Sequence, residues 1–238
     1  ANMNKYLDSG NEARIKKAYE SRDPRLQMAV ITPYAQYNGA SSGIAHTYTL
    51  RWPYRGSDSA EPFDIRTDTN DKFYYLWRKF VPEGLEQTER DTYGLDIPLI
   101  RYAEVLLLKA EALNEWGSTH ESEAIRCVNE VRRRAGHVEL NNATYPATKV
   151  NGQSDLRERI RNEYYWEIGG EDSMYFHELR WGTWKDKKFD NNRNGLMQMW
   201  GETTYTWYWL GDQCWSWPIP AKEMEMNSNL EQNEGWIN

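Results

Sequence analysis

The sequence predicts a mainly α fold, in which a helical hairpin and further helices are wrapped by long irregular loops and a small β-hairpin. Apolar residues recur at spacings of three and four within residues 97–168, and glycines close these periodic segments, as expected for amphipathic helices. After residue 203 the pattern changes, because tryptophan and tyrosine alternate with threonine in the period of a β-strand. The 238 residues suffice to bury a core without disulfide bonds, and we expect residues 1–238 to form one region.

The first 95 residues are the least regular part of the sequence. A short polar helix is expected near residues 10–21, and residues 73–82 fit either a strand or a short buried helix. Residues 40–62 carry Gly, Ser and Pro among aromatic side chains, which predicts a long surface loop. Loops of this length within a compact domain are usually functional or disordered, and the interleaved aromatic residues favour a functional loop.

A helical hairpin is predicted over residues 97–136. Its first helix ends at Gly117, and Ser118 with Glu121 forms a capping box for the second helix. The core-facing residues are Leu99, Ala103, Leu106, Ala110 and Leu113 on the first helix and Ala124, Val128, Val131 and Ala135 on the second. The span fits a tetratricopeptide-like unit of about 34 residues. Such units need neighbours on both sides, and the sequence has one clear copy, so we expect another module to cover it.

Three arginines, Arg132, Arg133 and Arg134, lie at the predicted end of the second helix. They oppose the negative end of the helix dipole, so we interpret them as a solvated charged end and not as a nucleic-acid patch. The formal net charge of −7 also disfavours binding to a phosphate backbone. Nucleic acid is therefore not an expected partner.

Further helices follow the hairpin. A third helix is expected to start at Asp155, with Glu158 completing a capping box, and to stop at Gly169. Its core-facing residues are Leu156, Ile160, Tyr164 and Ile168. Short helices are expected over residues 172–182 and directly after Pro220.

The small β-hairpin is predicted over residues 203–217, with Gly211 and Asp212 in its turn. Tyr208 lies on one face of its first strand, where we expect it to be exposed. The rings on the opposite face are expected to be core residues: Tyr205, Trp207 and Trp209.

Five segments, taken in order, carry a resemblance to a known family. They are SRDPRLQMAV (21–30), LIRYAEVLLLKAEALN (99–114), AIRCVNEVRRRAG (124–136), LRERIRNEYYWEIGGEDSMYFHELRWG (156–182) and WPIPAKEMEMNSNLEQNEGW (217–236). Together they resemble the C-terminal half of the SusD/RagB family, the surface glycan-binding lipoproteins of Bacteroidetes outer membranes. The resemblance implies a mostly helical fold, in which tetratricopeptide-like units are wrapped by a loop-rich remainder.

The resemblance also implies a location and partners. Family members capture ligand at the cell surface above a SusC-like, TonB-dependent β-barrel transporter of the outer membrane. They also have an N-terminal half with a signal peptide, a lipidated cysteine and further helical repeats. The opening residues of this sequence contain no apolar segment of the signal-peptide kind. We therefore expect the chain to be the C-terminal part of such a protein, with its N-terminal half as the module that covers residues 97–136.

A glycan site needs aromatic planes for the C–H faces of sugars and polar side chains for their hydroxyl groups. Residues 34–56 and the predicted β-hairpin have this composition. The candidate ligand-binding residues are Tyr34, Tyr37, Asn38, Arg51, Trp52, Tyr54 and Tyr208. They are chosen from composition, because no ligand motif of the family can be transferred position by position.

No catalytic residue is predicted. Glu163 and Glu167 lie one helical turn apart, and a carboxylate pair could serve a glycosidase. However, Arg157, Arg159 and Arg161 on the same helix favour structural ion pairs for these carboxylates. The histidines are scattered, without the spacing of metal ligands.

One segment, DNNRNG at 190–195, fits an oxygen-rich loop of the kind that binds Ca²⁺, with Asp190, Asn192 and Asn194 as candidate ligands. Gly201 stands where an EF-hand needs glutamate, so the choice is between a looser Ca²⁺ loop and an ordinary Asn-rich turn. No other cofactor is expected. Cys127 lies on the apolar side of its helix, and we expect it to be core rather than bridged to Cys214.

These observations predict a non-catalytic surface protein that captures oligosaccharides or polysaccharides for uptake through a TonB-dependent transporter. A closely related function keeps the fold and replaces the glycan with a peptide, as in RagB-like uptake proteins. Two functions of a different kind stay open: a tetratricopeptide-type scaffold for protein interactions and a glycoside hydrolase.

Overall fold

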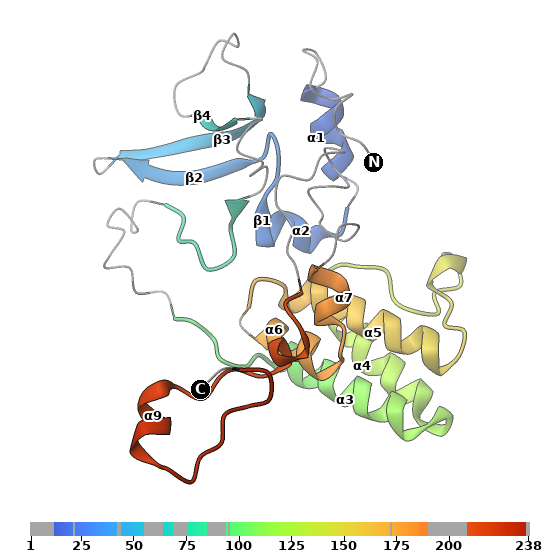
Figure 1. The fold of residues 1–238 in the computed structure, drawn as a ribbon. Coiled ribbons are helices and arrows are strands. Elements are labelled where there is room, and N and C mark those ends of the chain that lie inside the picture. The colour runs from blue at the N-terminus through green and yellow to red at the C-terminus, as the bar shows by residue number, and fades with distance from the viewer. Residues whose placement is uncertain are drawn as a thin grey trace. The chain divides into compact units, whose positions relative to one another are not determined.

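The computed structural model describes residues 12–20, 22–41, 44–54, 64–68, 76–84, 94, 96–171, 173–189 and 209–236, without the side chains of 12, 14, 15, 40, 41, 51–54, 64–68, 187 and 188. Helices outweigh strands in these ranges, which confirms the mainly α class (Figure 1). Contacts divide the chain into a larger unit, residues 6–174, and a C-terminal unit that begins at Tyr175.

The larger unit is built on three helices, α3 (Tyr102–Trp116), α4 (Glu121–Arg134) and α5 (Gln153–Ile168). α3 and α4 form the predicted helical hairpin, and α5 packs against both (Figure 1). The apolar residues that they bury are Leu106, Leu107, Ala110 and Leu113 of α3, Ala124, Ile125, Val128 and Val131 of α4, and Leu156, Ile160, Tyr164 and Ile168 of α5. The apolar period of the sequence matches the helical turn, so it identified most of this core correctly.

The junction between α3 and α4 differs in part from the prediction. Gly117 ends α3 as expected, with a φ of 139° that favours glycine. Ser118 does not cap α4, because a turn of 3₁₀-helix, η3 (Ser118–His120), comes first and α4 has no side-chain cap. Leu99 lies before α3 and is exposed, so the core-facing stripe begins later than predicted.

The start of α5 also differs. The helix begins at Gln153, so Asp155 lies inside its first turn and not at the N-cap. From there its carboxylate still accepts a hydrogen bond from the backbone N–H of Asn151 at 2.9 Å. Between α4 and α5 the connection contains a second 3₁₀ turn, η4 (Pro146–Thr148), and α5 ends at Gly169 as predicted.

Short helices and strands precede α3 in the larger unit. They are α1 (Glu12–Glu20), α2 (Pro24–Ala29), β1 (Val30–Ile31), β2 (Gln36–Ser41), β3 (Ile44–Tyr54), β4 (Asp64–Asp68) and β5 (Leu76–Trp77). β1 pairs antiparallel with β5, while β3 lies between antiparallel β2 and parallel β4. α1 confirms the predicted polar helix, and β5 decides for the strand within residues 73–82.

The predicted surface loop over residues 40–62 is wrong over Ile44–Tyr54, which form β3. The run Thr47–Leu50 explains the strand, because β-branched and aromatic residues suit a pleated surface. Leu50 is fully buried, which anchors one face of the sheet. Gly and Ser residues precede this run, and because they are typical of loops the sequence pattern predicted a loop and not a strand.

The C-terminal unit contains most of α6 (Ser173–Arg180), α7 (Trp184–Lys188), a 3₁₀ turn η5 (Asp212–Trp215) and α9 (Ala221–Met226). The short helices predicted near 172–182 and after Pro220 are confirmed by α6 and α9. The predicted β-hairpin is wrong in its described half, because residues expected in the returning strand form η5.

Ring packing explains why the tryptophan-rich segment turns instead of pairing as strands. The Trp209 ring packs with centroid distances of 5.9 Å to Trp184, 5.2 Å to Phe189 and 5.0 Å to Trp215. η5 brings Trp215 back onto Trp209 over a short stretch of chain, and the Cys214 N–H donates to the Gly211 carbonyl within it. Trp209 is therefore a packing residue, as predicted.

Two further findings concern the cysteines and the hydropathy of the described helices. Cys127 is a buried free thiol, which agrees with its prediction as a core residue, and Cys214 is also a free thiol. No helix within the described ranges combines the length and the apolar composition that a membrane span requires.

Candidate functional site

Tyr34 occupies a tight turn with an unusual backbone conformation. The turn runs from Thr32 to Ala35, and the Ala35 N–H donates to the Thr32 carbonyl at 2.9 Å. Pro33 takes its second position and Tyr34 its third, where φ is 64°. Glycine or asparagine is usual at a positive φ in such a turn, because other side chains there cost of order 1–3 kcal/mol. A tyrosine held in this strained position is a candidate for a functional residue.

Tyr34 lines a pocket of about 360 Å³, which we call the Tyr34 pocket. Its walls are Lys16, Tyr19, Glu20, Gln27, Thr32, Pro33, Tyr34, Ala35, Gln36 and Arg78. They come from α1, α2, the turn between β1 and β2, the start of β2 and the residue after β5. The volume falls in the range of about 300–1,000 Å³ that is usual for small-molecule sites. Two tyrosines beside amide, hydroxyl and charged groups match the composition that a sugar site needs.

Arg78 holds the walls of the Tyr34 pocket together. Its guanidinium donates to the Gln27 carbonyl at 3.0 Å and also to the Gln36 carbonyl. Its Nε lies 2.7 Å from a carboxylate oxygen of Glu83, which forms an ion pair on the other side. Because Gln27 belongs to α2 and Gln36 to β2, one side chain fixes the distance between two walls.

The other predicted ligand residues that the structure describes lie outside the pocket. Tyr37 on β2 is half-buried, and its hydroxyl donates to the Pro82 carbonyl at 2.6 Å. Burial and the nearby Glu83 carboxylate raise the pKa of the Tyr37 hydroxyl. Asn38 is exposed on the opposite face of the strand, where its side-chain oxygen accepts from the Thr47 hydroxyl. The structure therefore does not bring Tyr34, Tyr37 and Asn38 into one site.

The side chains of the remaining candidates are not among those that the structure describes. Arg51, Trp52 and Tyr54 belong to β3, but the description of the strand does not include their side chains. Tyr208 and the Ca²⁺ candidates Asp190, Asn192 and Asn194 lie outside the described residues. Within the described part of the chain, no group of three or more His, Cys, Asp or Glu side chains is arranged to hold a metal ion.

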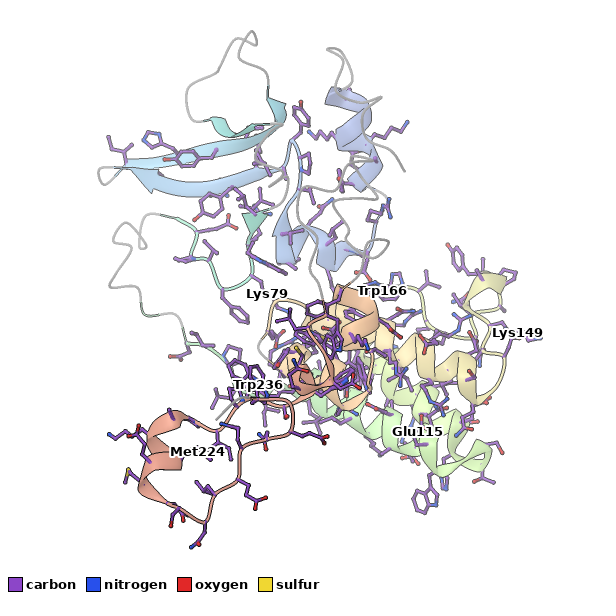
Figure 2. The ribbon with its side chains drawn as sticks, in the orientation of Figure 1. Lys79, Glu115, Lys149, Trp166, Met224 and Trp236 are labelled. Carbon is purple, nitrogen blue, oxygen red and sulfur yellow. The ribbon has the colours of Figure 1, made fainter. Side chains whose placement is uncertain are left out.

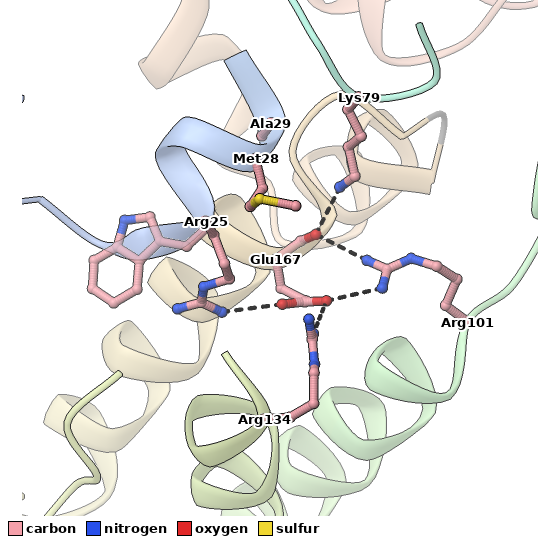
Figure 3. A pocket seen from close by; sticks show the side chains of 8 residues that line it. Arg25, Met28, Ala29, Lys79, Arg101, Arg134 and Glu167 are labelled. Carbon is pink, nitrogen blue, oxygen red and sulfur yellow. Dashed lines mark hydrogen bonds and ion pairs between the residues drawn. The ribbon is translucent and has the colours of Figure 1, made fainter. Parts of the chain in front are cut away.

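A second group of charged side chains, the arginine–glutamate cluster, gathers on α5. Its acidic members are Asp23, Glu163, Glu167 and Glu171, and its basic members are Arg25, Lys79, Arg101, Arg132 and Arg134. Glu163 accepts from Arg25 at 2.7 Å and from Arg132 at 2.7 Å. Glu167 accepts from Arg25 at 3.2 Å, from Arg101 at 2.9 Å and from Arg134 (Figure 3).

This cluster corrects two predictions. Glu163 and Glu167 are in ion pairs as expected, but their partners come from other segments of the chain. The three arginines on α5 pair elsewhere, Arg157 with Glu115, Arg159 with Asp155 and Arg161 with Glu158. Arg132 is buried against Glu163, so the arginine run at the end of α4 is not simply a solvated charged end.

Two carboxylates of the cluster, Glu167 and Asp23, have lowered pKa values. Burial by itself raises the pKa of Glu167, but hydrogen bonds from Arg101 and Arg134 outweigh burial and hold that pKa below its usual value. Burial likewise opposes ionisation of Asp23, and the hydrogen bonds from Arg25 still lower its pKa. A carboxylate that guanidinium groups hold ionised is a poor proton donor, which applies to Glu167 and Asp23.

The cluster also borders a cavity of about 170 Å³, lined by Arg25, Met28, Ala29, Lys79, Arg101, Arg134, Trp166 and Glu167 (Figure 3). This is below the usual volume of ligand sites, and the basic side chains that line it are already engaged in ion pairs. Lys79 also donates to the Glu167 backbone carbonyl at 2.8 Å, which ties the segment after β5 to the end of α5. Two of the residues that line this cavity, Lys79 and Trp166, are labelled in Figure 2. The arginine–glutamate cluster therefore links distant segments of the fold, and the Tyr34 pocket is the better candidate for a ligand site.

Of the residues that line the Tyr34 pocket, the sequence analysis selected only Tyr34 as a candidate. Lys16, Tyr19 and Gln27 are ordinary residues of their helices, and Arg78 follows a short strand, so none of them has a local signal. Only Gln36 could have been suspected, because it follows Tyr34 by two positions at the start of a strand.

Comparison with known proteins places the chain in a family. The SusD family profile matches residues 4–236, and the chain belongs to the SusD family. It is 32% identical to SusD-like protein P38 of Formosa agariphila over 139 residues, which are 58% of this chain and 24% of that protein. It is 28% identical to the starch-binding protein SusD of Bacteroides thetaiotaomicron over 161 residues, 67% of this chain and 25% of that protein. The chain thus spans about a quarter of the length of these relatives.

Solved structures show the same fold. A SusD-like protein from Bacteroides fragilis matches 92% of this chain and 40% of its own, with a TM-score of 0.59 and 23% identity. A SusD superfamily protein from Bacteroides vulgatus matches 90% of this chain and 40% of its own, with a TM-score of 0.59 and 22% identity. The predicted SusD-like fold is therefore confirmed.

Proposed function

We propose that this protein binds glycans without transforming them, as part of a nutrient-uptake system at the bacterial surface. Membership of the SusD family supports the proposal, since one relative is named as a starch-binding protein. The observation that carries it in this chain is the strained Tyr34 in a pocket of aromatic and hydrogen-bonding side chains.

The pocket offers the contacts that a sugar ring uses. A tyrosine face can pack on the axial C–H groups, and the side chains of Gln27 and Gln36 offer both donors and acceptors to hydroxyl groups. Lys16, Glu20 and Arg78 place charges at the walls, where charge-assisted hydrogen bonds to hydroxyls are stronger than neutral ones. The volume suits one or two sugar units of a longer chain, which fits capture of an oligosaccharide rather than enclosure of a free monosaccharide.

Isothermal titration of the protein with a panel of neutral and acidic oligosaccharides tests the proposal. We expect binding of at least one glycan, and we expect Tyr34→Ala and Gln36→Ala each to weaken it by about tenfold or more, the effect of losing a ligand-anchoring side chain. The matched control is Tyr145→Ala, an exposed tyrosine of the larger unit that does not line the pocket. No binding across the panel, or equal binding by the wild-type protein and both pocket variants, contradicts the proposal.

The same experiment separates glycan capture from peptide capture. Amide and tyrosine side chains can also hydrogen-bond a peptide backbone, so a panel of short peptides is titrated in parallel. Binding of peptides alone, weakened by the same pocket variants, would assign the site to peptide capture.

Absence of catalysis is part of the proposal. Both carboxylates that could have formed a hydrolase pair, Glu163 and Glu167, are buried and accept hydrogen bonds from arginines. Incubation with each glycan that binds should therefore release no reducing ends. Steady release that Glu163→Gln abolishes would make the protein a glycoside hydrolase.

We also propose that the protein acts at the outer membrane together with a SusC-like, TonB-dependent β-barrel transporter. The support is family membership, which the SusD profile gives over nearly the whole chain. Affinity purification from membranes of the native host should recover a large β-barrel transporter in stoichiometric amount. Recovery of the protein without any transporter, under detergents that keep other surface complexes intact, contradicts this part.

A further inference from the structure

The dipeptide Asn-Gly occurs three times in the sequence, at Asn38, Asn151 and Asn194. Asparagine followed by glycine is prone to spontaneous deamidation, because glycine has no side chain to hinder the attack of its backbone nitrogen on the asparagine amide. In a folded protein the reaction also requires that the peptide group between the two residues can rotate. Asn194 lies outside the described residues, whereas the structure describes the surroundings of Asn38 and Asn151.

The peptide group between Asn38 and Gly39 is fixed within β2. The Asn38 carbonyl accepts a hydrogen bond from the Gly84 N–H at 2.9 Å. Gly39 lies opposite His46 of β3 in the antiparallel ladder. Successive residues of a strand point their N–H and C=O groups in opposite directions, so those of Gly39 face β3. Rotation of this peptide group would therefore detach part of β2 from both of its neighbours.

Two tyrosine rings also cover Gly39. The residue is buried, and a Cβ added there would lie 2.8 Å from the Tyr37 ring and 2.8 Å from the Tyr48 ring. Such close packing leaves no room for the Gly39 nitrogen to move toward the Asn38 side chain. The first copy of the dipeptide is therefore protected by the fold.

The peptide group between Asn151 and Gly152 lacks these restraints. Both residues are exposed in the connection that precedes α5. Within the described part of the chain, neither the Asn151 carbonyl nor the Gly152 N–H has a hydrogen bond. Gly152 has a φ of 85°, and a Cβ added there would meet nothing within 4 Å. The Asn151 side chain donates to the carbonyl of Lys149, a residue labelled in Figure 2, at 3.3 Å, which is long for a hydrogen bond.

The hydrogen bonds that Asn151 and Gly152 do make lie on the outer sides of the pair. The Asn151 N–H donates to the Asp155 carboxylate at 2.9 Å, and the Gly152 carbonyl accepts from the Leu156 N–H at 3.0 Å. Neither bond involves the peptide group that joins the two residues. That group can therefore rotate while α5 stays folded.

We propose that Asn151 is a site of spontaneous deamidation in the folded protein, while Asn38 is protected. The deprotonated Gly152 nitrogen attacks Cγ of Asn151 and forms a C–N bond, and the amide nitrogen of Asn151 leaves as ammonia with the proton that Gly152 lost. Water then opens the cyclic imide at either carbonyl group and returns a proton to the Gly152 nitrogen. The products are aspartate and isoaspartate at position 151. The proposal is independent of which ligand the Tyr34 pocket takes.

The isoaspartate product should loosen the start of α5. Isoaspartate adds one carbon atom to the main chain between two buried residues, Val150 and Leu156. The Val150 N–H is held by the Asn141 side chain at 2.7 Å, so the extra length has to be taken up on the Gly152 side. The hydrogen bond from the Leu156 N–H to the Gly152 carbonyl should then weaken, and the first turn of α5 should open more often.

Peptide mapping by mass spectrometry tests the proposal in the chain of residues 1–238. The protein is incubated at pH 8, folded or in guanidinium chloride, and conversion is followed separately at Asn38 and Asn151. In the folded protein we expect Asn151 to convert many-fold faster than Asn38. In denaturant the two rates should lie within a few-fold of each other, because the dipeptide is the same. Conversion at Asn151 should be slower at pH 7, since the attacking nitrogen must lose its proton.

Asn151→Gln is the matched control variant. Glutamine would have to close a larger ring, so the peptide that contains position 151 should stay unconverted over the same time. Hydrogen exchange of the first turn of α5 should rise several-fold in the isoaspartate fraction of the incubated wild-type protein, and it should not change in the incubated Asn151→Gln protein.

Three results would overturn the proposal. Equal conversion at Asn38 and Asn151 in the folded protein would show that the fold does not distinguish them. Conversion at Asn151 that is many-fold slower in the folded protein than in denaturant would show that this connection is protected as well. Isoaspartate at position 151 without faster hydrogen exchange would remove the proposed effect on α5.

Discussion

At the scale of single residues, Arg25 shows how one side chain joins distant segments. The Arg25 guanidinium donates hydrogen bonds to the nearby Asp23 carboxylate and to that of Glu163, 138 positions further along the chain. The same Asp23 caps α2 by accepting the Arg25 backbone N–H at 2.9 Å. Asp23 therefore caps the start of α2, and Arg25 links that helix to α5.

Glu167→Gln tests how much this fastening stabilises the larger unit. Glutamine keeps the shape of the side chain but removes the negative charge that Arg25, Arg101 and Arg134 share. Breaking a buried ion pair costs about 3–5 kcal/mol, and because Arg134 is half-exposed we expect about 3 kcal/mol from urea unfolding. Glu115→Gln, which breaks a partly exposed pair with Arg157, should cost below about 1 kcal/mol. Equal losses in the two variants would show that the cluster contributes no more than a surface ion pair.

At the scale of elements, a close contact links β5 to the end of α5. Gly170 follows α5 with a φ of 83°, and a Cβ added there would lie 2.7 Å from the ring of Trp77 on β5. Glycine is thus required twice, by its backbone conformation and by the ring that covers it. The contact lets the short strand pair β1–β5 sit close to the helices, where Lys79 then reaches the Glu167 and Gly169 carbonyls.

The contribution of the Trp77 contact can be separated from that of the backbone. Gly136 at the end of α4 has a similar φ of 71°, but a Cβ there would meet nothing within 4 Å. Gly136→Ala should therefore cost only the left-handed backbone strain, about 1–2 kcal/mol. Gly170→Ala should cost about 1–3 kcal/mol more, since the ring must also move. We expect the urea midpoint of Gly170→Ala to be lower than that of Gly136→Ala. Equal midpoints would mean that the Trp77 ring moves aside at little cost in free energy.

At the scale of the whole molecule, periodicity was the most informative signal in the sequence. It located α3, α4 and α5 and most of their buried apolar residues, because apolar residues at spacings of three and four lie on one face of a helix and that face packs in the core. It failed over β3 and η5, where aromatic residues fit a strand, a turn or a ring cluster equally well. The choice between these depends on neighbours such as Trp184 and Phe189, which local sequence does not reveal.

The candidate site was less predictable than the fold. Composition pointed to Tyr34, but the pocket also needs Gln27 from α2 and Arg78 from the segment after β5. The ion-pair partners of Glu163 and Glu167 were mistaken for the same reason. Charges on one helix are visible in a sequence as neighbours, whereas Arg25 and Arg132 reach Glu163 only after the chain has folded.

The pH dependence of folding follows from groups whose pKa values are lowered in the folded chain. Burial lowers the pKa of the His137 imidazole. Its Nδ1 atom lies 3.6 Å from Oδ2 of Asp23, and it also interacts with the charges of Arg132, Glu163 and Arg25. Arginine hydrogen bonds hold the pKa values of Asp23 and Glu167 low against the effect of burial. In each case the unfolded chain binds protons more readily than the folded chain, so acid favours unfolding.

Stability should therefore fall in two stages as pH decreases from 8. The first begins below the unfolded pKa of histidine, about 6.5, as His137 takes up a proton on unfolding. The second begins below about 4.3, the unfolded pKa of glutamate, as Glu167 and then Asp23 are protonated. Urea unfolding of the wild-type protein at closely spaced pH values measures both stages. His137→Gln should remove the first stage and keep the second. Glu167→Gln should make the second stage smaller without removing it, because Asp23 still titrates there, and should keep the first. A stability that stays constant between pH 7 and pH 5, or that loses its first stage only in Glu167→Gln, would show that these groups do not control the response to acid.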